Sequence, residues 1–489
     1  MIIITFLALI LGIISVLKVS KLLVEQYYSF SRVLGVFKDV FKDDLKMNLT
    51  LLFFIISSFF MFLIKESIYL YIISLLCFYL LIPDIPLKKY SFTRRNVLLI
   101  SFSIIFYILG IFLGVYYKLN FLLMFSEPFS IICVILSYLF LFPLEKSIQN
   151  YYLKKAKKKI NYKKRIIIGI TGSFGKTTMK NILYSLLSVK YKISNQNHNY
   201  NTLMGLSKFI NNEMDINDDV LIFELGIDHK NSMHKFKKLF NLDYAIITSI
   251  GEMHLSTFKS LDNIINEKIK IKDLLNDKGL LIINKDIEKY YQTLNIKYET
   301  YSLNDIEILN QGVIRYKGYN VSTKLISSFQ FESLSGAILL SLKMNLSHQE
   351  IILGLQNIIL PSRRLNIVNK GKTIIIDDSY NANLKGVLEA LKILDTYKSK
   401  KIVITGGLIE LGNKYEMYNR QIAIQMIKCD IIYAVDLSLN HPLCDEIIKQ
   451  GYQEKLHIIT QGDIKELLKS NDEEKVILFL AKGNNIYLN

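Results

Sequence analysis

Tryptophan is absent from this chain of 489 residues, and cysteine and proline are scarce, with four and six residues. The four cysteines are Cys77, Cys133, Cys429 and Cys444; no two of them form a Cys-x-x-Cys pair, and the first two stand in apolar runs. This spacing predicts neither a zinc site nor a disulfide framework. We therefore expect free thiols in a reducing compartment.

Acidic residues are also in deficit, with 43 Asp and Glu against 60 Lys and Arg and a net charge of +17. Such an excess fits nucleic acid, an anionic membrane surface or a lysine-biased composition. The second half of the chain shows no basic stripe with interleaved aromatic residues, and Ile, Lys and Asn are abundant throughout. We therefore predict no nucleic-acid partner.

Charge is nearly missing from long parts of the first 145 residues. A helix of about 20 apolar residues crosses a hydrocarbon core of about 30 Å. The first run has no basic residues before it and no small-residue cleavage site, so we interpret it as a span and not as a signal peptide. The five runs that are long enough, or nearly so, are 2–17, 48–64, 67–86, 96–117 and 120–143.

Lysine and arginine gather in every second connection, within 18–46, 88–95 and 146–165. With five spans these segments share one side, which the positive-inside rule assigns to the cytoplasm. Glu127 beside Pro128 is an exception within the fifth run, and a kink or an interfacial residue explains it better than a transport role. We predict a multi-pass helical bundle in the cytoplasmic membrane over 1–145, and a basic cytoplasmic linker over 146–164.

A phosphate-binding loop follows the predicted linker. "RIIIGITGSFGKTTMKNILYSLL" (165–187) runs from an apolar strand through a glycine-containing turn into an amphipathic helix. Backbone N–H groups of such a turn, and the helix N-terminus after it, bind phosphate oxygens. Lys176 would reach the β- and γ-phosphates, and the Thr177 hydroxyl would bind Mg²⁺. The predicted nucleotide-binding residues are Thr171, Gly172, Ser173, Phe174, Gly175, Lys176, Thr177 and Thr178.

The spacing of this loop differs from the common GxxxxGK[ST] pattern, because Ile170 stands where the first glycine would be. Further along, "VLIFELG" places Glu224 at the carboxyl end of an apolar strand. In an open α/β sheet that end faces the ligand crevice, and a carboxylate there suits Mg²⁺. His254 follows another apolar strand, "DYAIITSI", although a single histidine is more often structural than a ligand.

A second α/β pattern begins near residue 363. The segments "TIIIDD", "KIVITGG", "DIIYAVD" and "VILFLAKG" alternate with helical stretches, which predicts a parallel sheet of the Rossmann type. No GxGxxG follows the first strand, so there is no dinucleotide fingerprint. We predict a phosphate-loop central domain over 165–362 and a Rossmann-like C-terminal domain over 363–489.

Several ordered motifs together resemble one family. The short phosphate loop, "NHNYNTLMG" (197–205), "DDSYNAN" (377–383) and "GGLIELG" (406–412) are similar to those of the Mur ligases, which form amide bonds with ATP in bacterial cell-wall synthesis. "DDSYNAN" and "GGLIELG" favour the branch that adds D-alanyl-D-alanine. The resemblance covers about 165–489 and implies ATP and Mg²⁺ as cofactors.

The resemblance also implies roles for single residues. Glu224 and His254 would join Thr177 as metal ligands, with Lys268 carbamylated and bridging the metal ions. Without the resemblance, Lys268 would be a solvated helix residue. Arg364 would contact the nucleotide and act in catalysis with Lys176, Lys268, His254 and Asp378; Asn284 and Asp286 would lie near the base. The implied substrate-binding residues are Asn201, Thr202, Ser379, Tyr380, Asn381, Asn383 and Glu410.

The chain departs from the family pattern in three places. Apolar runs replace the usual N-terminal nucleotide-sugar-binding domain, so the usual soluble UDP-linked substrate is in doubt. Phe329 and Ser333 stand where the family usually has His and Asn. Leu384 follows Asn383 where the family commonly has proline.

These features predict an ATP-dependent peptide ligase. Phosphorylation of a carboxylate gives an acyl phosphate that an amine attacks, which requires positioning and charge neutralisation but no enzyme nucleophile. We expect an amino acid or a dipeptide such as D-Ala-D-Ala to be added to a cell-wall precursor at the inner membrane face, and a lipid-linked form of this precursor stays open. A ligase for another surface polymer such as poly-γ-glutamate stays open, and so does the oligomeric state. An ATP-driven transporter is a remote alternative, suggested only by "SLSGA" (333–337).

Overall fold

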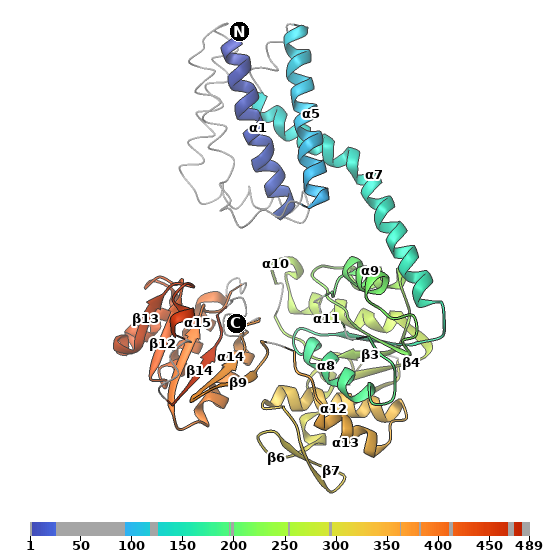
Figure 1. The fold of residues 1–489 in the computed structure, drawn as a ribbon, viewed down its shortest axis with the longest axis vertical. Coiled ribbons are helices and arrows are strands. Elements are labelled where there is room, and N and C mark those ends of the chain that lie inside the picture. Colours follow the sequence, from blue (N-terminus) through green and yellow to red (C-terminus); the bar gives the residue numbers. More distant parts are fainter. Residues whose placement is uncertain are drawn as a thin grey trace. The chain divides into compact units, whose positions relative to one another are not determined.

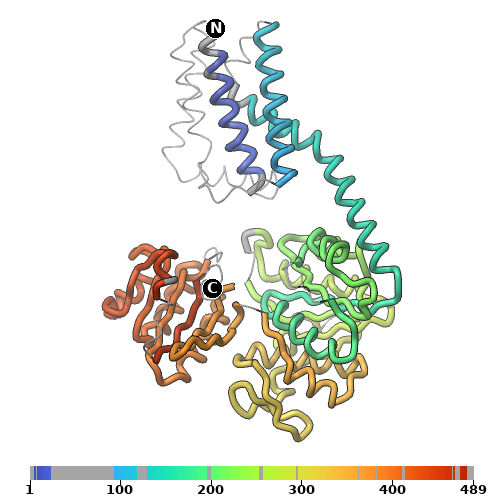
Figure 2. Tube along the Cα trace, viewed as in Figure 1, coloured from blue at the N-terminus to red at the C-terminus, as the bar shows by residue number. Residues whose placement is uncertain are grey.

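The computed structural model describes residues 2–25, 93–117, 126–194, 196, 200–252, 255–292, 296–361, 363–380, 383–409, 414–467 and 474–481 (Figures 1 and 2). Two predicted spans, 48–64 and 67–86, lie outside these residues, as do three predicted site residues, His254, Asn381 and Glu410. Internal contacts divide the chain into two units, 1–150 and 151–489.

The first unit contains α1 (Ile2–Glu25), α5 (Arg94–Tyr116) and the beginning of α7 (Ser126–Ile160). The Tyr107 ring is fully buried, and its hydroxyl donates a hydrogen bond to the Ala8 carbonyl at 2.8 Å. A Cβ at Gly12 would lie 1.9 Å from that hydroxyl, so α1 and α5 approach closely. By length and composition, two helices among the described residues could cross a membrane, Arg94–Tyr116 and Phe129–Ile160.

Helix α7 continues through much of the predicted linker. Its last turns expose Lys154, Lys155, Lys157 and Lys158 and bury Leu153, Ala156 and Ile160 at one-turn spacing. The buried side chains belong to a hydrophobic cluster of the second unit, and two side chains of α9 (Leu203–Asn212) donate hydrogen bonds to the Tyr152 carbonyl. Residues 146–160 are therefore helical, and the end of this helix forms part of the second unit.

The central sheet has five parallel strands in the order β2-β1-β3-β4-β5. The chain places β2 on one side of β1 and then β3 on the other, and ligands bind at the carboxyl ends of strands where the order reverses in this way. The strands are β1 (Ile166–Thr171), β2 (Val220–Glu224), β3 (Leu242–Ile247), β4 (Leu275–Asn284) and β5 (Tyr298–Tyr301).

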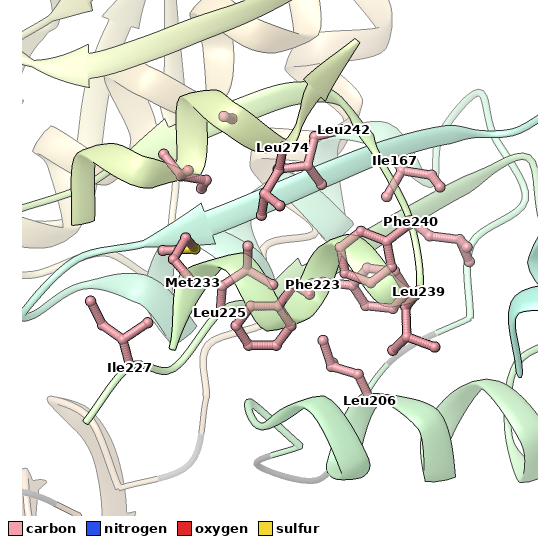
Figure 3. Close-up of a cluster of buried hydrophobic side chains, with 14 of the residues drawn as sticks. Ile167, Leu206, Phe223, Leu225, Ile227, Met233, Leu239, Phe240, Leu242 and Leu274 are labelled. Carbon is pink, nitrogen blue, oxygen red and sulfur yellow. The ribbon is translucent and has the colours of Figure 1, made fainter. Parts of the chain in front are cut away.

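Apolar residues on both sides of these strands bury both faces of the sheet. Ile168 and Ile170 of β1 belong to the cluster under α8 (Lys176–Leu187), α12 (Ser328–Lys343) and α13 (His348–Gln356). Ile167 faces the other way, as the period of two in a strand requires. Figure 3 shows that second cluster, with Phe223 of β2 above Leu206 of α9. Its remaining cover includes η1 (Met233–Lys238), α11 (Leu261–Ile269), η2 (Lys270–Leu274) and the end of α7.

Small elements complete the central domain. Strands β6 (Glu307–Asn310), β7 (Val313–Tyr316) and β8 (Tyr319–Ser322) form an antiparallel three-stranded sheet. The short helices are α10 (Leu255–Phe258), η3 (Lys285–Tyr290) and η4 (Leu303–Asp305).

The C-terminal domain contains the second predicted α/β sheet, in the order β13-β12-β11-β14-β10-β9. Its strands are parallel except β9, an antiparallel edge strand that was not predicted. Strand β14 lies between β10 and β11 and is parallel to both, so the carboxyl ends of β10 and β11 lie on either side of the carboxyl end of β14. The elements are β9 (Asn366–Lys370), β10 (Thr373–Asp377), α14 (Leu384–Asp395), β11 (Lys400–Thr405), α15 (Tyr415–Met426), β12 (Ile431–Val435), α16 (Pro442–Lys449), η6 (Gln453–Lys455), β13 (Leu456–Ile459), α17 (Ile464–Leu467) and β14 (Lys475–Phe479).

Candidate active site

The predicted phosphate loop joins β1 to α8 at the point where the strand order reverses. Gly172 and Gly175 have φ values of 154° and 80°, a region that side chains with a Cβ rarely adopt. A Cβ at Gly172 would also lie 2.0 Å from the Thr248 hydroxyl. Backbone conformation therefore requires glycine at both positions.

The N-terminus of α8 is open. Gly175 is its N-cap residue, and no side chain caps the helix with a hydrogen bond. The first N–H groups of a helix have no partner within the helix, and the helix dipole adds partial positive charge there. This end of α8 therefore suits phosphate oxygens.

A second loop, which follows β3, braces the phosphate loop. The Ser173 N–H donates to the Ser249 carbonyl at 2.9 Å, and the Phe174 N–H donates to the Ser249 hydroxyl at 2.7 Å. The Thr248 hydroxyl donates to the Phe174 carbonyl, and the Ser173 hydroxyl donates to the Gly251 carbonyl. Since the N–H groups of Ser173 and Phe174 are used here, the first turn of α8 is the part of the motif left to bind phosphate.

Lys176 lies over the loop that precedes it. Its ammonium group donates to the Gly172 carbonyl at 2.7 Å. Burial lowers the pKa of Lys176 to about 8; Glu224 opposes this decrease, and the Arg364 charge adds to it. A bound polyphosphate would supply the anionic partner that favours the charged form of Lys176.

Thr177, Glu224 and Lys180 form a buried polar group beside the loop. The Thr177 hydroxyl donates to Glu224 Oε2 at 3.1 Å, and Lys180 Nζ lies 3.3 Å from Glu224 Oε1. Lys180 also donates to the Gln196 carbonyl at 2.9 Å. Lys180 was not among the predicted site residues. Its position four residues after Lys176, on the same face of the helix, could have indicated it.

This group fits Mg²⁺ in its donor chemistry, because a hydroxyl and a carboxylate are the hard oxygen ligands that the ion prefers. Glu224 Oε1 is buried and accepts no hydrogen bond, although Lys180 Nζ lies 3.3 Å away as its ion-pair partner, so a metal ion there would share this carboxylate with Lys180. Within the part of the chain that the structure describes, no cluster of three or more His, Cys, Asp or Glu side chains could hold a metal. A complete ligand set would therefore need further groups, such as the predicted His254 and Lys268.

Lys268 on α11 is buried, not solvated as its local sequence alone predicts. Burial lowers the pKa of Lys268 well below its usual value; the Lys176 charge lowers it further, and Glu267 opposes the change. The Glu267 carboxylate accepts hydrogen bonds from the N–H groups of Asn231 and Met233, each at 2.9 Å. Burial therefore favours the neutral form of the Lys268 amine, the form that reacts with carbon dioxide to give a carbamate.

Asn284 ends β4, and its side chain is buried. Its amide oxygen accepts a hydrogen bond from the Asp286 N–H at 2.9 Å. The side chain also hydrogen-bonds to Glu332 on α12; this bond lowers the pKa of Glu332, but burial raises it more. Phe329 and Ser333 stand three residues before and one after Glu332, on the same face of α12. The structure therefore brings Asn284 to the helix that carries Phe329 and Ser333, one of the three departures from the family pattern.

Arg364, Asp378 and Tyr380 lie together at the carboxyl end of β10. The Arg364 guanidinium is 4.4 Å from the centre of the Tyr380 ring. Burial raises the pKa of Asp378 to about 7, with Arg364 opposing the rise and Asp377 adding to it. The charge of Arg364 also acts on Lys176, so the structure brings the predicted residues of both domains within electrostatic range.

The predicted substrate-binding residues make structural contacts. The side chains of Thr202 and Asn383 cap α9 and α14 by accepting backbone N–H groups at 3.2 and 3.0 Å. Ser379 is buried, and its hydroxyl accepts a hydrogen bond from Arg363 Nε at 3.0 Å. The Asn201 carbonyl accepts an N–H from the loop after β2 at 2.8 Å. A role in substrate binding for these residues stays a prediction.

One ion pair that sequence analysis missed joins the two domains. Lys414 Nζ, next to the start of α15, lies 2.6 Å from the carboxylate of Glu252. The Tyr418 hydroxyl donates to the same carboxylate at 3.4 Å. Glu252 directly follows the loop that braces the phosphate loop.

Comparison with known proteins adds independent information. Residues 170–345 match the family model of the Mur ligase middle domain. A UDP-N-acetylmuramoyl-tripeptide–D-alanyl-D-alanine ligase of Bacillus subtilis is 25% identical over 335 residues, which cover 64% of this chain and 72% of the relative. A ligase of the same name from Borreliella burgdorferi is 33% identical over 264 residues, which cover 50% of this chain and 56% of the relative.

Solved structures share the fold. The MurF ligase from Thermotoga maritima in complex with ADP superposes with a TM-score of 0.58 at 20% identity, over 69% of this chain and 81% of that chain. A pseudomurein peptide ligase type C from Methanothermus fervidus gives a TM-score of 0.51 at 18% identity, over 67% and 78% of the two chains. Residues 170–345 thus match a Mur ligase middle domain, and the chain, which is similar to the Mur ligases, is an ATP-dependent ligase.

Proposed function

We propose that this ligase adds an amino acid or a dipeptide such as D-Ala-D-Ala to a cell-wall precursor at the inner membrane face, through an acyl phosphate. The observation that carries the proposal is the open N-terminus of α8 with Lys176 and the buried Thr177–Glu224 pair beside it. The names of the Bacillus and Borreliella relatives support D-Ala-D-Ala as the amine substrate.

The proposed reaction has two steps, phosphoryl transfer and then attack by the amine. A carboxylate oxygen of the precursor attacks the γ-phosphorus of ATP, the bond to ADP breaks, and an acyl phosphate forms. The amine nitrogen then attacks the acyl carbon, a C–N bond forms, phosphate leaves, and the nitrogen loses a proton. Lys176, Arg364 and the N-terminus of α8 neutralise the phosphoryl charge. Asp378, with a pKa of about 7, accepts the proton at neutral pH.

Thr177 and Glu224 would hold Mg²⁺, which would neutralise phosphate charge when bound. His254 would add a nitrogen ligand, as the family resemblance implies. Lys268 would contribute as a carbamate, because burial lowers the pKa of its amine and so favours the form that can be modified. The modification would convert a poorly solvated cation into an anionic ligand.

The observations say less about the identity of the acceptor than about that of the amine. Helices α5 and α7 supply two stretches able to cross a membrane, and the match to the family model begins only at residue 170. We propose that the first 145 residues form five spans, with the ligase domains on the cytoplasmic side, and that the acceptor is lipid-linked. Tethering the ligase raises its effective concentration toward such an acceptor. The same observation favours a second candidate, a ligase for a surface polymer such as poly-γ-glutamate.

The test uses the full-length protein in lipid nanodiscs. Phosphate release from ATP is measured with D-Ala-D-Ala and either UDP-muramoyl-tripeptide or the corresponding lipid-linked muramoyl-tripeptide. We expect turnover that requires the amine and is faster with the lipid-linked acceptor. Faster turnover with the UDP-linked acceptor would contradict the lipid assignment, and glutamate-dependent turnover alone would support the polymer ligase. Phosphate release that no tested amine stimulates would refute ligation of these substrates.

A further inference from the structure

Two of the three residues that connect the two domains have an unusual backbone conformation. Arg363 and Leu365 have φ values of 65° and 50°, and neither is glycine. This conformation is strained for a residue with a Cβ and persists only when its surroundings hold it. Arg364, which is predicted to act on the nucleotide, lies between them.

The central domain holds this linker through Gln330 on α12. The Gln330 side chain is buried, and its amide nitrogen donates long hydrogen bonds to the carbonyls of Arg364 and Leu365, at 3.4 and 3.5 Å. Its amide oxygen accepts the N–H groups of Ile326 and Ser327 at 2.8 and 3.2 Å. One buried side chain therefore both caps α12 and holds the linker.

The C-terminal domain holds the linker from the other side. The Arg363 guanidinium donates to the hydroxyl and the carbonyl of Ser379 at 3.0 and 3.3 Å. The Tyr380 N–H donates to the Arg363 carbonyl at 3.1 Å. The Leu365 N–H donates to the Asp378 carboxylate. Groups of both domains thus fix the backbone on each side of Arg364.

This arrangement determines where the charge of Arg364 lies. The guanidinium lies against the Tyr380 ring and acts electrostatically on Lys176 and Asp378. If the backbone relaxed to negative φ values at the flanking residues, the side chain of Arg364 would point elsewhere. The linker conformation and the position of this charge are therefore coupled.

We infer that Gln330 and Arg363 are positioning residues, which hold the linker so that the Arg364 guanidinium neutralises the charge of the phosphoryl group in transfer. The inference rests on the proposed function, because it assigns Arg364 to the phosphoryl-transfer step. Neither Gln330 nor Arg363 itself contacts the reacting atoms.

Gln330→Glu separates the two roles of this side chain. The variant keeps an acceptor oxygen for the cap of α12 but replaces the donor to the linker carbonyls with an oxygen. Glutamate serves in this position elsewhere in the chain, since Glu350 forms the capping box of α13 with Ser347. The matched control is therefore the reverse exchange, Glu350→Gln, which leaves the linker untouched.

In full-length protein we expect Gln330→Glu to lower kcat about 10-fold or more, a part of the 10²–10³-fold typical of losing one charge-stabilising group. The Kd for ADP should stay within about twofold, because ADP lacks the transferred phosphoryl group, and Glu350→Gln should change neither quantity. Arg363→Lys keeps the charge but loses the two-pronged contact with Ser379, and should lower kcat in the same way. An unchanged kcat in both Gln330→Glu and Arg363→Lys would overturn the inference.

A double-mutant cycle tests whether Gln330 acts through Arg364. In an Arg364→Ala background, Gln330→Glu should lower kcat by less than twofold. A merely structural role would instead give the full additional loss, and that result would overturn the inference.

Amide hydrogen exchange of Leu365 and Tyr380 tests these contacts without any measurement of turnover. We call the hydrogen bonds of Gln330 and Arg363 that hold residues 363–365 the clasp. We expect faster exchange in Gln330→Glu than in wild type, and unchanged exchange would contradict the clasp. If wild type shows no amine-dependent turnover while exchange in the variant rises, the proposed function is wrong and the clasp stands.

Discussion

Two strand–turn–helix units of this chain lie at the carboxyl ends of parallel strands, yet their helix N-termini differ. In β1–α8 the N-cap is Gly175, which makes no side-chain cap hydrogen bond. In β10–α14 the N-cap is Asn383, whose side chain accepts the Gly386 N–H at 3.0 Å. The first helix end is open to a phosphate group and the second is already satisfied. A shared βα geometry therefore becomes an anion site only where the cap residue leaves the N–H groups free.

The charged residues near the two turns also differ, because one turn carries lysines and the other carries aspartates. Lys176 and Lys180 stand on the first turns of α8. Asp377 ends β10 and Asp378 follows it, and burial raises the pKa of both. One turn thus carries positive charge and the other carries carboxylates, one with a pKa of about 7, which are the charges that the proposed mechanism requires for ATP and for the amine.

The largest expected effect concerns the open helix end. Lys176→Ala should lower amine-dependent phosphate release by about 10²–10³-fold, because one charge-stabilising group is lost from the phosphoryl-transfer site. The control is Lys190→Ala, an exposed lysine just beyond α8, which should leave the rate unchanged. Equal rates for the two variants would remove the phosphate loop from the mechanism.

Glu224→Gln should reduce thermal stability strongly, because it leaves the buried Lys180 charge without its anionic partner. Loss of one member of a buried pair costs about 3–5 kcal/mol. Asp219→Asn provides the comparison, since its ion pair with Lys163 is partly exposed and should contribute only about 0–1 kcal/mol. A Tm decrease of the same size in both variants would contradict a special role for the buried group.

Asp378 should make stability depend on pH in a defined direction. Its folded pKa of about 7 lies above the usual value of 3.8, so the unfolded state releases this proton first. Stability should therefore fall as pH rises from about 4 to about 7, by about 2 kcal/mol for a half-buried group. Tm measured across this range should lose that slope in Asp378→Asn.

Asp463 supplies the opposite sign. Hydrogen bonds from Thr460 lower the pKa of its exposed carboxyl, so any contribution to stability is present at neutral pH and fades as pH falls through the folded pKa. Asp378→Asn and Asp463→Asn should therefore change the pH dependence of Tm in opposite directions. If both variants changed it in the same direction, burial of Asp378 would not be the cause of the slope.

The smallest expected effects are those of substitutions at the two helix N-caps, which can be compared directly. Gly175→Ala should cost about 1 kcal/mol at its left-handed backbone position and weaken ADP binding. Asn383→Ala should cost about 1 kcal/mol of stability through loss of the cap and leave ADP binding unchanged. Titration calorimetry with ADP separates the two. Similar losses of affinity would show that the helix ends do not differ in function.

Local pattern predicted much of the fold and part of the site. The strand–glycine–helix pattern predicted the phosphate loop. The apolar strand before Glu224 predicted a carboxylate at the carboxyl end of the sheet, and the structure places that carboxylate beside Thr177. These features depend on neighbours in sequence, which a period of two or of 3.6 reveals.

The other contacts could not be predicted because they join distant segments. The pairing of Lys180 with Glu224 and the hydrogen bonds of Gln330 to the linker form only when the chain is folded. The burial of Lys268 has no local signal either, since its own helix is rich in charged residues. The antiparallel β9 was missed because it follows the domain junction and pairs only with β10.

The end of α7 has a practical consequence for any shortened form of this protein. A fragment that begins at residue 165, where the family resemblance begins, would lack Leu153, Ala156 and Ile160. Each large apolar side chain removed from a core costs about 1.5–3 kcal/mol of burial, and the apolar surface that these residues cover would meet water. We expect such a fragment to aggregate, and one that begins before Tyr151 to remain monodisperse in size-exclusion chromatography. The region that looks like a tether thus supplies part of the interior of the enzyme it carries.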